Sequence, residues 1–179
     1  MTIKTKIHLL LLVAGGLGIY GCLKIQNVSP IPSIAFKNFV QYGMDSAALT
    51  ITFQDGDGDV GLAVSDSAPP FNANSIYHHD IFLIYYNKGS DGLLHRYYSS
   101  LNPPGDSLEY DYNIPNVTPS GQNKAITGNI RVSLNFVPYW ASQGGRPVDS
   151  TFCFKVYIYD RALHKSNVIT TPPITVPSY

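Results

Sequence analysis

An aspartate-glycine stretch is the part of this sequence best suited to chemistry. Residues 54–61 read Gln-Asp-Gly-Asp-Gly-Asp-Val-Gly, so Asp55, Asp57 and Asp59 alternate with glycines. Carboxylates this close repel one another unless a cation neutralises them. The glycines let the chain curl so that oxygens face one point, and calcium prefers about six to eight oxygen ligands. The stretch therefore predicts a calcium site, with magnesium as the second choice of metal and a solvated acidic turn as the alternative.

The spacing is similar to that of EF-hand and dockerin calcium loops, without matching them. Asp55, Asp57 and Asp59 would take the first, third and fifth positions of such a loop, and Asp66 the twelfth. Val60 stands where those loops need glycine, and the residues before the stretch alternate as a strand does. We therefore exclude an EF-hand and keep the cation. The stretch has no histidine or cysteine, which argues against zinc.

Two strands decide where these carboxylates point. Apolar residues alternate with mostly polar ones over residues 47–54, and the same inward parity continued one step further reaches Asp55. Residues 151–160 alternate in the same way, and their inward parity reaches Asp160. In an immunoglobulin-type sandwich the two loops that follow these strands lie at the same end. We therefore expect Asp160 to complete the metal site.

The rest of the chain predicts a fold built from short strands. Tyrosine, glycine and proline are abundant, charged residues are sparse, and no segment after the N-terminal region has sustained helical periodicity. Turn residues separate the apolar segments. We predict an all-β, immunoglobulin-like antiparallel β-sandwich. Its expected strands are residues 33–39, 47–54, 80–87, 93–99, 108–112, 125–136, 151–160 and 167–176.

The N-terminal region reads as a bacterial lipoprotein signal peptide. Lys4 and Lys6 precede an apolar run at residues 7–20, which is short for a membrane span of about 20 apolar residues. Ile19-Tyr20-Gly21-Cys22 is similar to the lipobox of bacterial lipoproteins, which implies acyl chains such as palmitate on Cys22. The chain then divides into a signal peptide (1–21), a lipidated cysteine with a tether (22–32) and the β-sandwich domain (33–179).

Other candidate chemistry is weak. Cys153 is the only cysteine besides Cys22, so lipidation leaves no pair for an intrachain disulfide. The formal net charge is zero, which argues against nucleic acid as a partner. Glu109 and Asp111 share a strand face, but no second feature supports acid-base work. We expect no enzyme. A hydrolase is the third possibility, and it would require a pocket with a perturbed carboxylate or histidine.

Two motifs carry a resemblance to a known group. Residues 53–61 and 156–167 resemble uncharacterised lipoproteins of Bacteroidota, which have an early aspartate-glycine loop and a late strand that ends in Asp-Arg-Ala-Gly-Asn-Lys-Ser. The late motif is also similar to bacterial immunoglobulin-like domains of cadherin-like type. Leu163 and His164 replace its Gly-Asn. The resemblance implies an envelope location and this fold, and it supplies no activity.

Together these observations predict a non-enzymatic module of the cell envelope. A lipid anchor would hold it in the outer membrane, with the periplasmic and surface faces both open, and calcium would stiffen it for binding a protein partner or the envelope. The alternative is a carbohydrate-binding accessory lipoprotein. Tyr139 and Trp140, in a glycine-flanked loop, would then stack on sugar, although a purely structural role also explains them.

Overall fold

The computed structural model describes residues 28–43, 45–98, 107–121, 123–136 and 151–175. The predicted signal peptide, the lipidation site Cys22 and the aromatic pair Tyr139 and Trp140 lie outside the described residues. Within the described part, the chain forms nine strands and has no helix long and apolar enough to cross a membrane. The strands are β1 (Ser33–Gln41), β2 (Ser46–Asp55), β3 (Ile81–Lys88), β4 (Leu94–Arg96), β5 (Glu109–Tyr112), β6 (Ile126–Asn135), β7 (Thr151–Ile158), β8 (Ile169–Thr170) and β9 (Ile174–Thr175).

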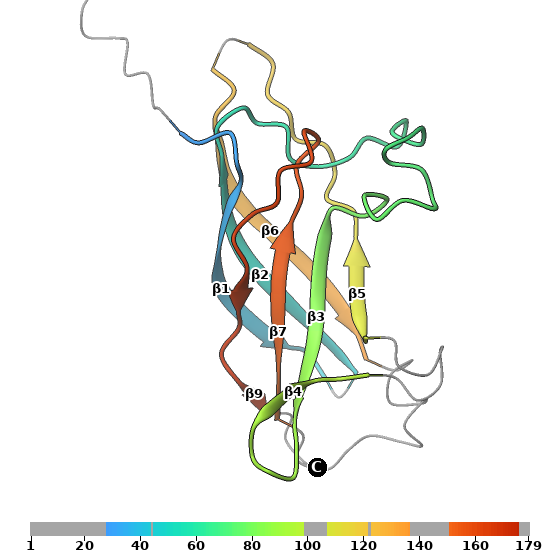
Figure 1. Cartoon of the computed structure of the whole chain (residues 1–179). Coiled ribbons are helices and arrows are strands. Elements are labelled where there is room, and N and C mark those ends of the chain that lie inside the picture. The colour runs from blue at the N-terminus through green and yellow to red at the C-terminus, as the bar shows by residue number, and fades with distance from the viewer. Residues whose placement is uncertain (1–27, 44, 99–106, 122, 137–150, 176–179) are drawn as a thin grey trace, which may run out of the picture.

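The strands form two antiparallel sheets. The smaller sheet has the order β1-β2-β6, and the larger has the order β4-β3-β7-β8, with β5 also paired to β3 and β9 to β7. Figure 1 shows the two sheets facing each other. The prediction of an all-β, antiparallel fold is confirmed, and the arrangement is consistent with a β-sandwich.

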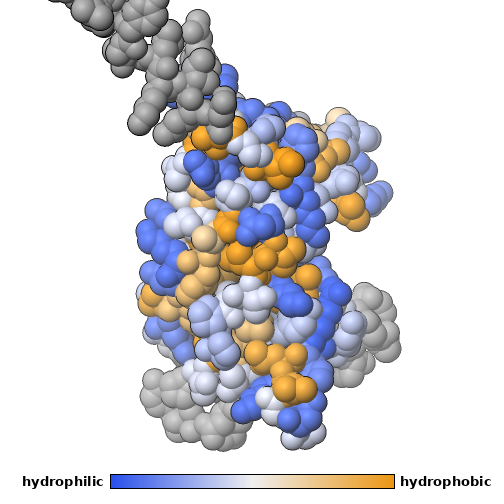
Figure 2. Space-filling model, turned by 60° about the vertical axis from the view of Figure 1, so that its left-hand side comes forward, coloured by the Kyte–Doolittle hydropathy of each residue, from blue (hydrophilic) through white to orange (hydrophobic). Residues whose placement is uncertain are grey.

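Alternation of buried and exposed side chains explains why these segments form strands. Leu49, Ile51 and Phe53 of β2 point into the core between the sheets, as do Phe154 and Val156 of β7. Polar residues take most of the intervening positions of β6, where they face outward. On the face shown in Figure 2 the apolar groups that remain visible form patches interrupted by polar ones.

The C-terminal part of the larger sheet differs from the prediction. One strand was expected over residues 167–176, and the structure has two short ones, β8 and β9. Pro172 and Pro173 cause the break, because proline has no backbone N–H for the ladder. The Thr171 hydroxyl accepts a hydrogen bond from Phe154 N at 3.0 Å and so keeps this stretch against β7.

A candidate metal centre

The loops after β2 and β7 bring four aspartates together. Asp55 is the last residue of β2, and Asp57 and Asp59 follow in its loop, whereas Asp160 lies just beyond β7. A β-bridge between Val60 and Asp160 joins the two loops. One carboxylate oxygen from each aspartate lies within 4.8 Å of those of the other three. We call this group, Asp55, Asp57, Asp59 and Asp160, the four-aspartate site.

Two members of the four-aspartate site are removed from solvent. Asp55 is 0 % exposed and Asp160 is 2 % exposed, as the parity of their strands predicted. Asp55 Oδ2 accepts a hydrogen bond from Asp59 N at 3.0 Å, but Asp55 Oδ1 has no partner among the described residues. The Oδ1 atoms of Asp57 and Asp59 are also buried without a partner there. A buried acceptor without a donor is costly, and a cation would satisfy all three.

Burial and mutual repulsion disfavour the charged form of the carboxylates in the four-aspartate site. Burial, together with the neighbouring charges of Asp57, Asp59 and Asp160, raises the pKa of Asp55 to about 6. Burial also raises the pKa of Asp59 to about 6, with Asp160 and Asp57 as the next causes. Near neutral pH the site therefore concentrates negative charge where solvent is partly excluded, and this arrangement attracts a cation.

The loop after β2 is here called the early loop, and the loop after β7 the late loop. Hydrogen bonds from the late loop hold Asp59 and Asp160 in place. Asp59 Oδ2 accepts from Ala162 N at 3.0 Å, and Asp160 Oδ1 accepts from His164 N at 2.7 Å. His164 Nδ1 lies 2.9 Å from Asp160 Oδ2, and this contact raises the pKa of His164. Leu163 adopts φ 68°, the left-handed conformation that glycine takes easily. Leu163, which stands where the similar late motif has glycine, therefore holds a conformation that glycine would adopt easily.

Backbone packing explains why the early loop is not an EF-hand. Gly58 has φ 68°, and a Cβ there would lie 2.0 Å from the carbonyl oxygen of Lys124. Val60, at the position where EF-hands need glycine, is fully buried in the core. Asp66 lies outside the four-aspartate site, where it accepts a hydrogen bond from Ala63 N at 2.8 Å. The loop is thus a strand-to-strand connection whose carboxylates converge with Asp160.

The four-aspartate site offers only carboxylate oxygens from its side chains. Oxygen ligands suit hard cations such as calcium and magnesium, whereas zinc and copper favour nitrogen and sulfur. The structure therefore has a cluster of carboxylates that could hold a metal ion.

Asp80, which directly precedes β3, is a buried carboxyl outside the predicted site residues. It is 3 % exposed, and its Oδ1 accepts a hydrogen bond from Ile114 N at 2.7 Å, just after β5. Its carbonyl oxygen accepts from Tyr159 N at 2.8 Å, next to Asp160. Burial raises the pKa of Asp80 to about 7. The available signal in the sequence was its position as an acid directly before the apolar run of β3. Its hydrogen bonds connect the start of β3 with the chain just after β5 and just after β7.

The other chemical candidates lie apart from the four-aspartate site. Cys153 is buried and free in β7, and burial raises the pKa of its thiol, which disfavours a nucleophilic thiolate. Glu109 and Asp111 face outward on β5, where Arg96 pairs with Glu109. They line a hollow of about 540 Å³, here called the outer cleft (Arg96, Tyr98, Ser107, Glu109 and Asp111).

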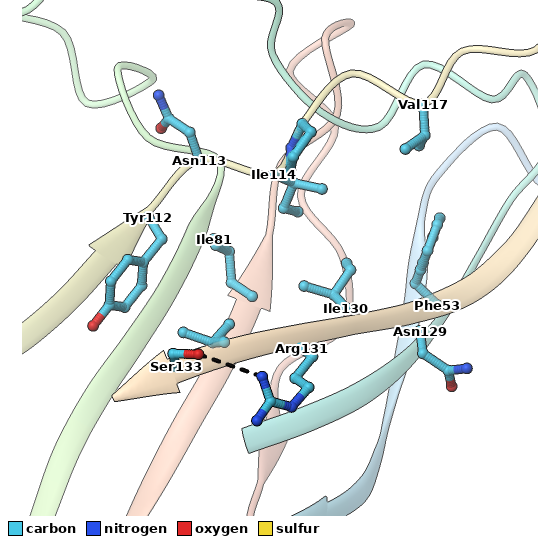
Figure 3. Close-up of a pocket in the computed structure, with 12 residues that line it drawn as sticks. Phe53, Ile81, Tyr112, Asn113, Ile114, Val117, Asn129, Ile130, Arg131 and Ser133 are labelled. Atoms are coloured by element: carbon cyan, nitrogen blue, oxygen red, sulfur yellow. Dashed lines mark hydrogen bonds between the residues drawn. The ribbon is translucent and has the colours of Figure 1, made fainter. Parts of the chain in front are cut away.

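A further hollow of about 470 Å³ opens at the edge of the two sheets, beside β6 (Figure 3). Figure 3 shows apolar side chains from both sheets around it, among them Phe53, Ile81 and Ile130. Arg131, whose guanidinium donates to Ser133 Oγ at 3.4 Å, is its one lining residue with a formal charge. This hollow therefore suits an apolar group and adds no acid-base pair.

Comparison with protein-family models, with curated proteins and with solved structures found no match. Sequence motifs and geometry therefore carry the assignment. The chain is an all-β protein of two antiparallel sheets with a cluster of four aspartates at one end.

Proposed function

We propose that this protein is a lipid-anchored module of the cell envelope whose β-sandwich is stiffened by one calcium ion at the four-aspartate site. The module works without catalysis, by binding a partner or supporting the envelope. The observation that carries the proposal is Asp55, which is fully buried with Oδ1 unpartnered among the described residues and within reach of three further carboxylates. A buried charge of this kind is retained where a counter-ion neutralises it.

Calcium fits the site better than magnesium. The ligands come from two loops far apart in the chain, and they include carboxylates of unequal exposure. Calcium accepts such irregular sets of oxygens at about 2.3–2.6 Å, whereas magnesium needs near-ideal octahedral geometry and keeps several waters. An exported domain also meets calcium outside the cytoplasm. The proposed ion would cross-link a loop of the smaller sheet to a loop of the larger.

The immunoglobulin-like topology and the cadherin-like character belong to the same proposal. Support comes from the pairing of β2 with β1 and β6 in one sheet and of β3 with β7 in the other. The acidic loops after β2 and β7 meet at one end of the sandwich, which is the end from which loops of immunoglobulin-type domains commonly bind ligands. Acyl chains on Cys22 would insert into the bilayer and hold the protein at the membrane.

Calorimetry with the Asp57→Asn variant tests the calcium site. Titration of calcium into the wild-type full chain at pH 7.5 should give heat at a stoichiometry of one, with magnesium much weaker. Asp57→Asn should weaken calcium binding at least about tenfold, because one charged ligand is lost. Asp91→Asn is the matched control, since it removes the same charge from an exposed turn. Absence of heat in the wild type, or equal binding by Asp57→Asn, would contradict the assignment.

The outer cleft favours a second candidate function, glycan binding. Tyr98 is 54 % exposed at the cleft, and Arg96 Nε donates to Ser107 Oγ at 2.7 Å beside the carboxylates of Glu109 and Asp111. An exposed ring flanked by both donors and acceptors suits a neutral, polyhydroxylated ring. This candidate platform uses described residues, whereas the sequence-based candidate was Tyr139 and Trp140.

A glycan array with the wild-type chain distinguishes this candidate from a purely structural module. Binding that Tyr98→Ala abolishes, and that Tyr42→Ala retains, is the result expected for a sugar site in the outer cleft. Tyr42 is the matched control because it is 60 % exposed and follows β1 of the other sheet. No binding, or equal binding by both variants, would dismiss the outer cleft as a glycan site.

A further inference from the structure

The chain that leads into β1 lies directly on the aspartate loop. Gly56, between the ligands Asp55 and Asp57, donates its N–H to the carbonyl oxygen of Ser29 at 2.9 Å. A Cβ on Gly56 would lie 2.2 Å from the carbonyl oxygen of Val28 and 2.6 Å from that of Ser29. The three heavy atoms nearest to such a Cβ all belong to residues 28 and 29. Glycine at this position is therefore what lets the incoming chain sit against the loop.

The same incoming chain is also bonded to the late loop. Asn167 Oδ1 accepts from Ile34 N at 2.8 Å, and Asn167 Nδ2 donates to the Ile34 carbonyl oxygen at 2.9 Å. Pro32, between the two attachment points, is fully buried. Figure 1 shows this segment, residues 28–34, joining the domain at the end where the loops after β2 and β7 lie. We call residues 28–34 the docked segment.

We propose that a cation in the four-aspartate site locks the docked segment onto the domain and thereby fixes the direction in which the chain leaves toward its membrane anchor. The inference rests on the proposed function of the site. The docked segment touches both loops that supply ligands, through Gly56 on one side and Asn167 on the other. Loss of the cation frees the segment, so the domain then hangs on a longer and looser tether.

Charge repulsion supplies the physical link between the site and the docked segment. Without a cation, Asp55 and Asp57 repel each other on either side of Gly56, and the loop relieves this by spreading. Spreading moves the Gly56 N–H away from Ser29 and separates the early loop from the late one. By thermodynamic linkage, the docked segment must strengthen cation binding by the same factor by which the cation strengthens docking. The coupling is therefore measurable from both sides.

Hydrogen exchange followed by mass spectrometry tests the coupling in the detergent-solubilised full chain. In the wild type, calcium should slow exchange at least about tenfold in peptides that contain Ile34 and Gly56, relative to chelator. Gly56→Ala should still bind calcium by calorimetry, more weakly, while the Ile34 peptide loses its calcium-dependent protection. Gly43→Ala, at a turn where a Cβ meets nothing closer than Ser46 Oγ at 3.9 Å, is the matched control and should behave as wild type.

A second variant keeps the test decisive if Gly56→Ala disturbs folding. Asn167→Ala removes both side-chain bonds to Ile34 without altering the aspartate loop, and it should also abolish calcium-dependent protection of the Ile34 peptide. Calcium binding in the wild type with unchanged exchange of that peptide would overturn the coupling and leave the calcium site intact. No heat of calcium binding in the wild type would overturn the site and the coupling together.

Discussion

Calcium is expected to raise the melting temperature of the domain by about 5–10 °C at pH 7.5 and to lose this effect at pH 5. An ion present at 100 times its dissociation constant stabilises a folded state by about 2.7 kcal/mol. In a domain of roughly 150 residues, 1 kcal/mol shifts the melting temperature by about 2–4 °C. The expected shift is therefore large enough for ordinary calorimetry or circular dichroism.

The pH dependence follows from the raised pKa values of the ligands. Asp55 and Asp59 have pKa values of about 6 in the folded chain, above the ordinary value of 3.8. The folded state therefore holds protons more tightly than the unfolded state between these values, so stability without calcium falls as pH rises through 6. Calcium needs the ionised carboxylates and replaces those protons. The difference between the melting temperatures in calcium and in chelator should therefore grow as the pH rises through 6 and disappear below it.

Melting scans in calcium and in chelator, at pH 5 and at pH 7.5, provide the measurement. Asp80, with a pKa of about 7, lowers stability with rising pH in both solutions, so its contribution cancels in the difference. A calcium effect of equal size at both pH values would show that binding does not involve the buried carboxylates. An identical melting temperature in calcium and in chelator at pH 7.5 would contradict the proposed stabilisation of the domain by calcium.

The second large effect is expected at Cys22, outside the described residues. Metabolic labelling with a palmitate analogue should mark the wild type, and Cys22→Ala should lose the label completely. A buried methylene contributes about 0.8 kcal/mol, so one acyl chain binds a bilayer marginally and several chains hold it durably. The wild-type protein should therefore stay attached to the membrane, and the Cys22→Ala variant should be released from it.

Cys153 supplies the control for the labelling experiment. It is the only other cysteine of the chain, and it is buried in β7, so Cys153→Ala should keep the full label. Label that persists in Cys22→Ala, or a wild type that takes up none, would contradict the lipid anchor. In either case the calcium site and its coupling to the docked segment would still stand on their own tests, but the proposed direction toward a membrane anchor would fall.

Alternating patterns predicted the central strands well. The inward parity of β2 and β7 came from apolar residues such as Ile51, Phe53 and Val156, which are buried as expected. Because side chains alternate with a period of two, the same pattern predicted that Asp55 and Asp160 point inward. The structure brings these two carboxylates close together. Local sequence was sufficient here because strand geometry propagates from residue to residue.

Features that depend on distant backbone could not be derived in the same way. The contact between Ser29 and Gly56 joins a segment expected to be a free tether to the centre of the acidic loop. The bond between Asp160 and His164 depends on Leu163 taking a left-handed conformation, which its side chain does not favour. Three-dimensional packing decides such details, and a single sequence records only which residues are present.

The separation of Asp55 and Asp160 along the chain bears on when the ion can act. Each sheet contains a pair of strands far apart in the chain, β2 with β6 and β3 with β7, and such pairs form slowly because long loops must close first. The carboxylates lie at the ends of β2 and β7, which belong to different sheets, so they converge only when the two sheets pack together. Interactions that form late in folding chiefly slow unfolding and do little to speed folding. A bound ion would then lengthen the lifetime of the finished domain, and an exported chain would have to cross the membrane and pair its strands before calcium could help it.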